Sequence, residues 1–277
     1  MLRSHNFKIF VLQINKSIKN VIEPRSTGPS DSSHLIIYYD LELCDGGLSS
    51  EIYQIGANTK NSKFSSFILP MGSIDWGVTK HCGGIKIKTD RHGNRKLFKL
   101  STPIPSVSAF EGLKSFIEWM KVLKQNGKYK DVILVAHGST DMPVLLHNVE
   151  QANLSNELKS VVNYFGDSLK YLQNCFPDFD KYNISYIYKK LFGQETGNAH
   201  DALRDAKVLC QIMDETKQGC EEKFIQNILK HTVSIEDGYR ISAKQVAESL
   251  RKKKLKTPKN SNMKRAPALP SDTLKSS

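Results

Sequence analysis

The sequence predicts an α/β fold in which a mixed sheet is flanked by helices. Residues 34–41 and 131–137 are both apolar runs rich in β-branched residues, the pattern of strands buried on both faces. A helix precedes the second run, because apolar residues recur at helical spacing (Phe110, Leu113, Phe116, Ile117 and Met120). A strand that follows a helix and earlier strands indicates a parallel crossover, and hence an α/β sheet.

The stretch from residue 34 to 47 ends in two acidic residues, Asp40 and Glu42, followed by Gly46 and Gly47. Residues two apart in a strand point the same way, so the two carboxylates share a face, about 6 to 7 Å apart. Half-desolvated carboxylates repel each other unless a cation lies between them. The alternative is that the strand has left the core and both acids are solvated.

The next elements are predicted from alternation and turn residues. Residues 51–58 and 63–69 form two more strands of an antiparallel meander, whereas residues 72–84 are irregular. Residues 85–88 and 96–100 flank a turn at 90–94 and form a hairpin. Its basic residues either follow a phosphate backbone or form a solvated edge that discourages aggregation: Lys86, Lys88, Arg91, Arg95 and Lys96.

Helices dominate the second half of the chain. Ser106 or Ser108 caps the helix that precedes the strand at 131–137. Further helices are expected around 142–150, 157–164, 168–175, 184–191, 202–216 and 220–230. A last helix, with a capping box of Ser242 and Gln245, runs to about residue 252.

Composition limits the class of protein. The apolar and charged fractions of the 277 residues are those of an ordinary soluble protein, and no apolar run has the roughly 20 residues of a membrane span. Five scattered cysteines without a Cys-x-x-Cys pair argue against a disulfide framework or a structural zinc site. We therefore expect a reducing compartment and no membrane partner.

The net charge of +12 resides mostly at the two ends. Residues 1–33 are a flexible N-terminal extension or an extra strand, with a mitochondrial presequence as the alternative. Residues 217–252 form a C-terminal helical extension, and the Lys/Pro/Ser-rich residues 253–277 are a disordered basic tail. The basic run 251–256 is a nuclear localisation signal, a phosphate-binding arm or a solubilising tail. The expected location is nuclear or cytoplasmic, with mitochondria as the alternative.

Three later acidic residues follow strands or border a buried helix stripe. Asp141 comes after the strand at 131–137, near the start of the next helix, where helix capping is the alternative explanation. The same alternative applies more strongly to Asp167. Asp205 borders the predicted buried stripe of Ala202, Ala206, Leu209 and Met213, where an acid is costly without a partner.

The four acids Asp40, Glu42, Asp141 and Asp205 are predicted at one edge of the sheet. Two divalent cations balance their charge, and oxygen ligands suit Mg²⁺ or Mn²⁺. Two such ions can activate water for phosphodiester hydrolysis. His200, just before the last of these helices, is then a general base.

These residues resemble the three motifs of the DEDDh exonucleases, the ribonuclease H-like 3′→5′ exonucleases of the DnaQ and ribonuclease T group. The motifs are Asp40-Leu-Glu42 with residues 51–57, then Ala136-His137 with Asp141, then His200-Asp-Ala-Leu-Arg-Asp205. The resemblance covers about residues 34–216. It implies a mixed five-stranded sheet with helices on its faces, two Mg²⁺ ions held by the four acids, and His200 as base.

The resemblance also implies binding and partner properties. The substrates are single-stranded nucleic acid 3′ ends, relatives are often dimers, and Asp167 has a positional role. Leu41, Leu43 and His137 are the expected substrate-binding residues. Leu43 departs from the Thr or Ser usual in the family, which puts the substrate pocket in doubt.

A finer resemblance concerns residues 52–70, which are similar to the exonuclease-like region of the promyelocytic leukaemia protein. That region lacks the acids, whereas this chain keeps all of them. Two hypotheses follow: a metal-dependent exonuclease acting on DNA or RNA, or a catalytically silent nucleic-acid or protein interaction module on the same fold. The intact set of acids favours the enzyme, because four clustered acids repel phosphate unless metal is bound.

Overall fold

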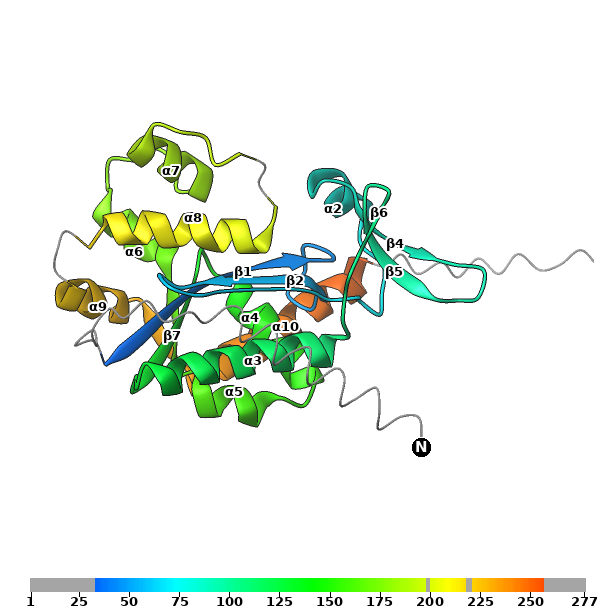
Figure 1. The fold of residues 1–277 in the computed structure, drawn as a ribbon, viewed down its shortest axis with the longest axis horizontal. Helices are drawn as coiled ribbons and strands as arrows, with labels where there is room; N and C mark the ends of the chain where they lie inside the picture. The colour runs from blue at the N-terminus through cyan, green and yellow to red at the C-terminus, as the bar shows by residue number, and fades with distance from the viewer. Residues whose placement is uncertain (1–32, 198–199, 218–220, 257–277) are drawn as a thin grey trace, which may run out of the picture.

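The computed structural model describes residues 33–197, 200–217 and 221–256. It contains a six-stranded sheet in the order β3-β2-β1-β7-β8-β9 and a separate three-stranded sheet in the order β4-β5-β6. Helices cover both faces of the larger sheet (Figure 1). The predicted mixed α/β fold is confirmed.

The central strand β1 (His34–Leu43) pairs antiparallel with β2 (Ile52–Asn58), which pairs antiparallel with β3 (Lys63–Phe67). On its other side β1 pairs parallel with β7 (Asp131–Ala136), as the crossover through a helix requires. β8 (Tyr164–Asp167) is parallel to β7, and β9 (Thr232–Ser234) is antiparallel to β8. The sheet therefore has one strand more than the five predicted, and the sixth comes from the C-terminal segment.

Two helical layers bury the faces of this sheet. One core lies beneath α3 (Ala109–Asn126), α4 (Asp141–Gln151), α5 (Ser155–Val161) and α10 (Ile235–Lys256). The other lies beneath α6 (Ser168–Cys175), α7 (Ile184–Phe192), α8 (Ala202–Glu215) and α9 (Glu221–Leu229). The two layers are on opposite sides of β1 in Figure 1.

The start of α3 follows the predicted capping pattern. The Ser108 side chain accepts a hydrogen bond from the backbone N–H of Glu111, whose carboxylate accepts one from the Ser108 backbone N–H. Four of the five predicted apolar positions are buried, but Phe110 is 47% exposed. Phe110 lies in the first turn, at the edge of the contact with the sheet, so its place on the buried face was wrongly predicted.

Several short elements were not predicted. Residues 72–84 were expected to be irregular, yet they contain α2 (Trp76–His81), capped by Asp75. β8 replaces the end of a helix predicted to reach residue 164, because α5 ends at Val161. β9 and the strand β6 (Thr102–Ile104) have only three residues each, too few for an alternation pattern to be visible.

Ser242 does not cap a helix. α10 begins at Ile235, and the buried Ser242 hydroxyl donates a hydrogen bond to the Pro143 carbonyl of α4 at 2.8 Å. The predicted capping box is therefore wrong, since the residues before Ser242 are helical already. The contact ties the C-terminal helix to the body of the fold, although the predicted domain boundary at residue 216 stays a prediction.

The smaller sheet consists of β4 (Ile85–Thr89), β5 (Arg95–Lys99) and β6, all antiparallel. The predicted hairpin is its first two strands. The sheet packs on the carboxyl end of β1 through a third core that contains Cys44, Tyr53, Ile85 and Leu97. It lies beyond the edge of the main helical layers in Figure 1.

The predicted tails lie largely outside the described residues. The extension at 1–33 contributes only Ser33 to the structure, and of the tail predicted as disordered only residues 253–256 are described, at the end of α10. Within the described ranges, none of the helices has both the length and the hydropathy needed to cross a bilayer.

Candidate active site

Three carboxylates meet at the carboxyl end of β1. Oxygen atoms of Asp40, Glu42 and Asp205 all lie within 4.8 Å of one another. Tyr38 of the same strand packs in the core beneath α8, so alternation directs Asp40 and Glu42 toward that helix. The expectation that these two acids share a face is confirmed, and the solvated alternative fails for Glu42, which is only 7% exposed.

The amino end of α8 approaches the sheet closely because β2 carries a glycine there. Gly56 is the register partner of Asp40. A Cβ at Gly56 would lie 2.0 Å from the Leu203 nitrogen and 2.1 Å from the Ala202 carbonyl carbon. The buried Gln54 side chain also accepts a hydrogen bond from the Ala202 N–H at 3.4 Å. These contacts set the distance between β1 and Asp205.

Replacement of Gly56 by alanine should therefore damage both the fold and the site. Overpacking of this kind costs about 1 to 3 kcal/mol, and the helix backbone would have to move away from Asp40. We expect Gly56→Ala to lower the thermal unfolding midpoint measured by circular dichroism. The matched control is Gly46→Ala, where an added Cβ meets nothing within 4 Å. Equal midpoints for the two variants would contradict the close approach.

Asp141 is the first residue of α4, as expected, and Thr140 occupies the N-cap position without a side-chain cap bond. The capping alternative for Asp141 therefore fails. Asp141 is 9% exposed and does not share the 4.8 Å group of the other three acids. It lies close enough that its charge raises the pKa of Asp40. Helix α4 thus brings the fourth acid to the rim of the cluster.

The pKa values of all four carboxyl groups are raised, because the groups lie close together away from bulk water. Burial, followed by the charges of Asp141 and Glu42, raises the pKa of Asp40 well above its ordinary value. Burial also raises the pKa of Glu42 to about 7, against an opposing hydrogen bond from Tyr53, and that of Asp141 to about 7. Burial raises the pKa of Asp205, while the His200 backbone N–H opposes the shift. Such clusters favour a bound cation.

His200 lies in a left-handed backbone conformation, with φ at +72°, immediately before α8. Its backbone N–H donates to the Asp205 carboxylate at 3.1 Å. A ring nitrogen of His200, a Glu42 oxygen and the Cys82 sulfur lie within 4.8 Å of one another. The side chain is exposed and therefore reaches both the cluster and the solvent.

His137 does not join this cluster. One ring nitrogen lies 3.0 Å from the Ser168 hydroxyl and the other 2.5 Å from the Tyr182 carbonyl. Burial lowers the pKa of His137. Its proposed contact with substrate therefore stays a prediction, and in this structure the ring joins the end of β7 to α6 and to the segment before α7.

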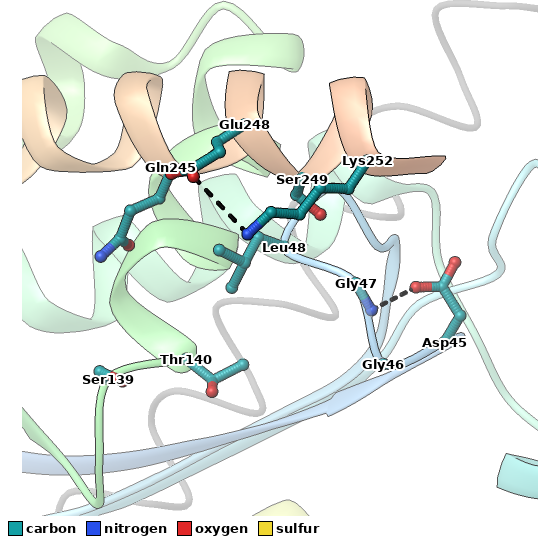
Figure 2. A pocket seen from close by; sticks show the side chains of 10 residues that line it. All are labelled: Asp45, Gly46, Gly47, Leu48, Ser139, Thr140, Gln245, Glu248, Ser249 and Lys252. Carbon is teal, nitrogen blue, oxygen red and sulfur yellow. Dashed lines mark hydrogen bonds and ion pairs between the residues drawn. The ribbon is translucent and has the colours of Figure 1, made fainter. Parts of the chain in front are cut away.

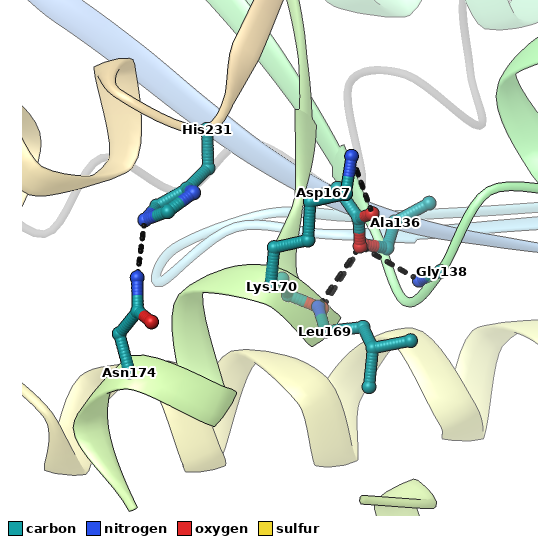
Figure 3. Close-up of polar contacts among 8 residues, drawn as sticks. Ala136, Gly138, Asp167, Leu169, Lys170, Asn174 and His231 are labelled. Atoms are coloured by element: carbon teal, nitrogen blue, oxygen red, sulfur yellow. Dashed lines mark hydrogen bonds and ion pairs between the residues drawn. The ribbon is translucent and has the colours of Figure 1, made fainter. Parts of the chain in front are cut away.

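The capping alternative for Asp167 is confirmed, and the residue also has the positional role that the resemblance implied. It caps α6 by accepting from the Leu169 N–H at 3.0 Å, and it accepts from the Gly138 N–H at 3.1 Å (Figure 3). Lys170 lies 3.9 Å from the same carboxylate. Asp167 thereby fixes the loop that leads from β7 to Asp141.

Leu41 and Leu43 lie on the other side of β1 from the acids. Leu41 is buried in the core under α3 and α4, and Leu43 packs against the same core after a register shift. A cleft adjoins this segment, between the turn at 45–48, the loop before α4 and the end of α10 (Figure 2). Thr140, next to Asp141, lines the cleft. On the side of α10, Lys252 and Glu248 line it too and form an ion pair one helical turn apart.

Comparison with known proteins identifies the family of this chain. Residues 34–191, more than half of the chain, match the Exuperantia RNase H-like domain. The chain belongs to this family of RNase H-like domains. No curated protein matches the sequence. The likeness to the promyelocytic leukaemia protein stays a prediction.

Two solved structures are similar to this chain. The chain is 18% identical to the 3′-exonuclease in a structure described as 3′-end specific recognition of histone mRNA stem-loop, with a TM-score of 0.51, over 67% of this chain and 82% of that chain. It is 17% identical to a full-length 3′-exonuclease, with a TM-score of 0.48, over 72% and 65% of the two chains. The first likeness supports the RNase H-like exonuclease fold.

The family match ends before His200 and Asp205. The assignment of these two residues to the site is therefore supported by their positions in the structure and not by the family match. Three residues near the acids were not assigned a role from the sequence: Tyr53, Gln54 and Cys82. The Tyr53 hydroxyl donates to Glu42 at 3.1 Å, and the Cys82 thiol lies 3.8 Å from the same oxygen. Strand alternation alone does not show that Tyr53 reaches Glu42, because that contact depends on the register between β2 and β1.

Proposed function

We propose that the protein is a metal-dependent 3′→5′ exonuclease that hydrolyses phosphodiester bonds at single-stranded DNA or RNA ends. The observation that carries this proposal is the approach of Asp40, Glu42 and Asp205 to within 4.8 Å of one another, with Glu42 buried and the other two half-buried. Three partly desolvated acids at this distance repel one another, and a bound cation offsets that cost.

The donor set fits hard divalent cations. Asp40, Glu42, Asp141 and Asp205 would hold two Mg²⁺ ions, with Mn²⁺ as a substitute, because carboxylate oxygens are the ligands these ions prefer. Ligands of one such ion at about 2.1 Å lie roughly 3 to 4 Å apart, compatible with the observed group. When bound, the ions would lower the pKa of a water molecule and stabilise the leaving oxygen.

The protein's own residues would position the substrate and move the proton. His200 is exposed beside Glu42 and would accept the proton of the attacking water as general base. The bond from its N–H to Asp205 fixes the residue relative to the acids. Leu43 and the backbone of Leu41 would face the terminal nucleotide at the end of β1, and His137 would contribute from the end of β7.

The first solved relative supports the substrate class, since it is described as recognising the 3′ end of an RNA stem-loop. By analogy we propose nucleic acid 3′ ends as the partner of this chain. A homodimer, and a nuclear or cytoplasmic location with mitochondria as the alternative, stay predictions. The choice between DNA and RNA depends on contacts to the 2′-hydroxyl.

The second candidate is a catalytically silent nucleic-acid or protein interaction module, because the family match ends at residue 191 and does not include His200 and Asp205. The acidic residues distinguish the two candidate functions. A surface that only binds nucleic acid gains nothing from buried carboxylates that repel phosphate. The retained set at Asp40, Glu42, Asp141 and Asp205 therefore favours the enzyme.

Cleavage of 5′-labelled single-stranded DNA and RNA in Mg²⁺ tests the proposal. We expect a ladder that shortens from the 3′ end and vanishes in EDTA. His200→Ala should slow cleavage about 10²- to 10⁴-fold, the usual contribution of a general base, while Mg²⁺ still stabilises the protein. Absence of cleavage by folded wild-type protein, with binding retained, would instead establish the silent module.

A further inference from the structure

The small sheet of β4, β5 and β6, here called the accessory sheet, is fixed to the carboxylate site. Its core with β1 and β2 buries Ile85 and Leu97 almost completely. The segment before it is tied to the strand end by the Asp75 N–H, which donates to the Cys44 carbonyl at 2.8 Å. Cys82, just before β4, lies 3.8 Å from Glu42. The accessory sheet therefore begins beside the acids and extends away from them (Figure 1).

The accessory sheet has one apolar and one basic face. Cross-strand partners share a face, and Ile87 is paired with Leu97 on the buried one. On the outer face, Lys88 is paired with Lys96, and Lys86 with Phe98. The three lysines are exposed. The Lys88 ammonium lies 4.5 Å from the centre of the partly exposed Phe98 ring.

Most of the charge of this face has no partner within the described part of the chain. No carboxylate there forms an ion pair with Lys86, Lys88 or Lys96. Asp90 in the hairpin turn is attracted to Lys96 without direct contact, while its carboxylate accepts hydrogen bonds from Asn94 and from the His92 N–H. One acid therefore faces three lysines.

Like charges directly opposite each other destabilise a strand pair, so the pairing of Lys88 with Lys96 has a cost. The two arginines of the hairpin have other functions. Arg95 donates to the carbonyls of Met71 and Gly72, and Arg91 lies 3.1 Å from the His92 ring. Protection of a sheet edge needs charge, but it does not need two lysines that face each other.

We propose that the outer face of the accessory sheet binds the phosphate backbone of single-stranded nucleic acid whose 3′ end lies at the carboxylate site. The inference rests on the proposed function for the position of the 3′ end. Lys86, Lys88 and Lys96 would contact phosphates, and Phe98 would offer a surface on which a base stacks. A polyanion would also relieve the repulsion between Lys88 and Lys96. The basic face thus continues the path of the strand away from the acids.

The test is the salt dependence of binding, measured by fluorescence anisotropy with 5′-fluorescein oligonucleotides of about 20 nucleotides in EDTA, where no metal-dependent cleavage occurs. The variant is Lys88→Gln/Lys96→Gln in the full chain. Removal of facing like charges should leave folding intact, which a thermal melt verifies. The matched control is Lys223→Gln/Lys230→Gln, which removes two exposed lysines from α9 and from the turn that follows it, at the far end of the central sheet (Figure 1).

We expect the slope of log K against log salt to become shallower by about 1.4 in the Lys88/Lys96 variant, since each phosphate contact contributes about 0.7 for single strands. The control should keep the wild-type slope. Equal slopes for the two variants would overturn the proposal, because the loss would then reflect net charge alone. Loss of binding to vesicles rich in phosphatidylserine, with oligonucleotide binding unchanged, would overturn it in favour of a membrane surface. Cleavage plays no part in this assay, so failure of the proposed enzyme activity would be seen separately.

Discussion

Asp40→Asn should abolish cleavage and at the same time stabilise the metal-free protein. Asp40 is repelled by the other three acids of the site. Burial raises its pKa most, and the charges of Asp141, Glu42 and Asp205 raise it further. An amide of the same shape removes that repulsion. It also removes a ligand of the proposed metal ions, so activity should fall by at least about 10³-fold, because the charge that stabilises the transition state is lost with the ion.

The gain in stability should be about 2 kcal/mol, within the range that a buried polar group without a partner usually costs, and this corresponds to roughly 4 to 8 °C in the unfolding midpoint of a domain of this size. Calorimetry in EDTA at pH 8 measures it. Asp178→Asn is the matched control, because Asp178 is an exposed loop residue and the same chemical change should alter neither stability nor activity. An Asp40→Asn protein that is less stable than wild type in EDTA would show that the cluster is held by internal hydrogen bonds instead.

The positions of Asp40, Glu42 and Asp205 were predictable because they follow from periodicity. Strand alternation fixes the face of the first two, and helical spacing fixes Asp205 beside the buried stripe of α8. Both patterns involve residues that are close together in the chain, so they can be recognised in a single sequence without knowledge of the fold. Asp141 followed from a rule of topology, since the loop after a parallel strand leads to the same edge of the sheet.

The contacts that set the spacing of the acids could not be predicted in this way. Gln54 and Gly56 of β2 contact the first residues of α8, which lie almost 150 positions away in the sequence. Cys82 reaches Glu42 only because α2 forms where the sequence shows no helical periodicity. Ser242 looked like a helix cap, but a buried carbonyl of Pro143 uses its hydroxyl. Tertiary contacts decided each of these cases.

Metal-free protein should lose stability as the pH rises from about 4 to about 7. Burial raises the pKa of Glu42 to about 7 and that of Asp141 to about 7. The unfolded chain ionises these groups near pH 4, so in this interval the folded state binds more protons than the unfolded state. Stability therefore falls with rising pH, and the part of the loss that comes from Glu42 and Asp141 is complete above pH 7. A shift from 4.5 to about 7 corresponds to about 3 kcal/mol for Glu42 alone.

Mg²⁺ should reverse this loss, and its effect should itself depend on pH. Above pH 7 Glu42 and Asp141 are ionised, and a bound cation attracts them and offsets their repulsion. Near pH 5 the cation must first displace their protons. We expect the rise in unfolding midpoint on addition of Mg²⁺ to be larger at pH 8 than at pH 5.5, as measured by scanning calorimetry. The control is the Glu42→Gln/Asp141→Asn variant, in which the pH dependence between 5.5 and 8 should flatten and the Mg²⁺ shift should disappear. A wild-type protein whose Mg²⁺ shift is the same at both values of pH would show that the ion binds elsewhere, because a site built from protonated carboxyls cannot bind a cation without releasing those protons.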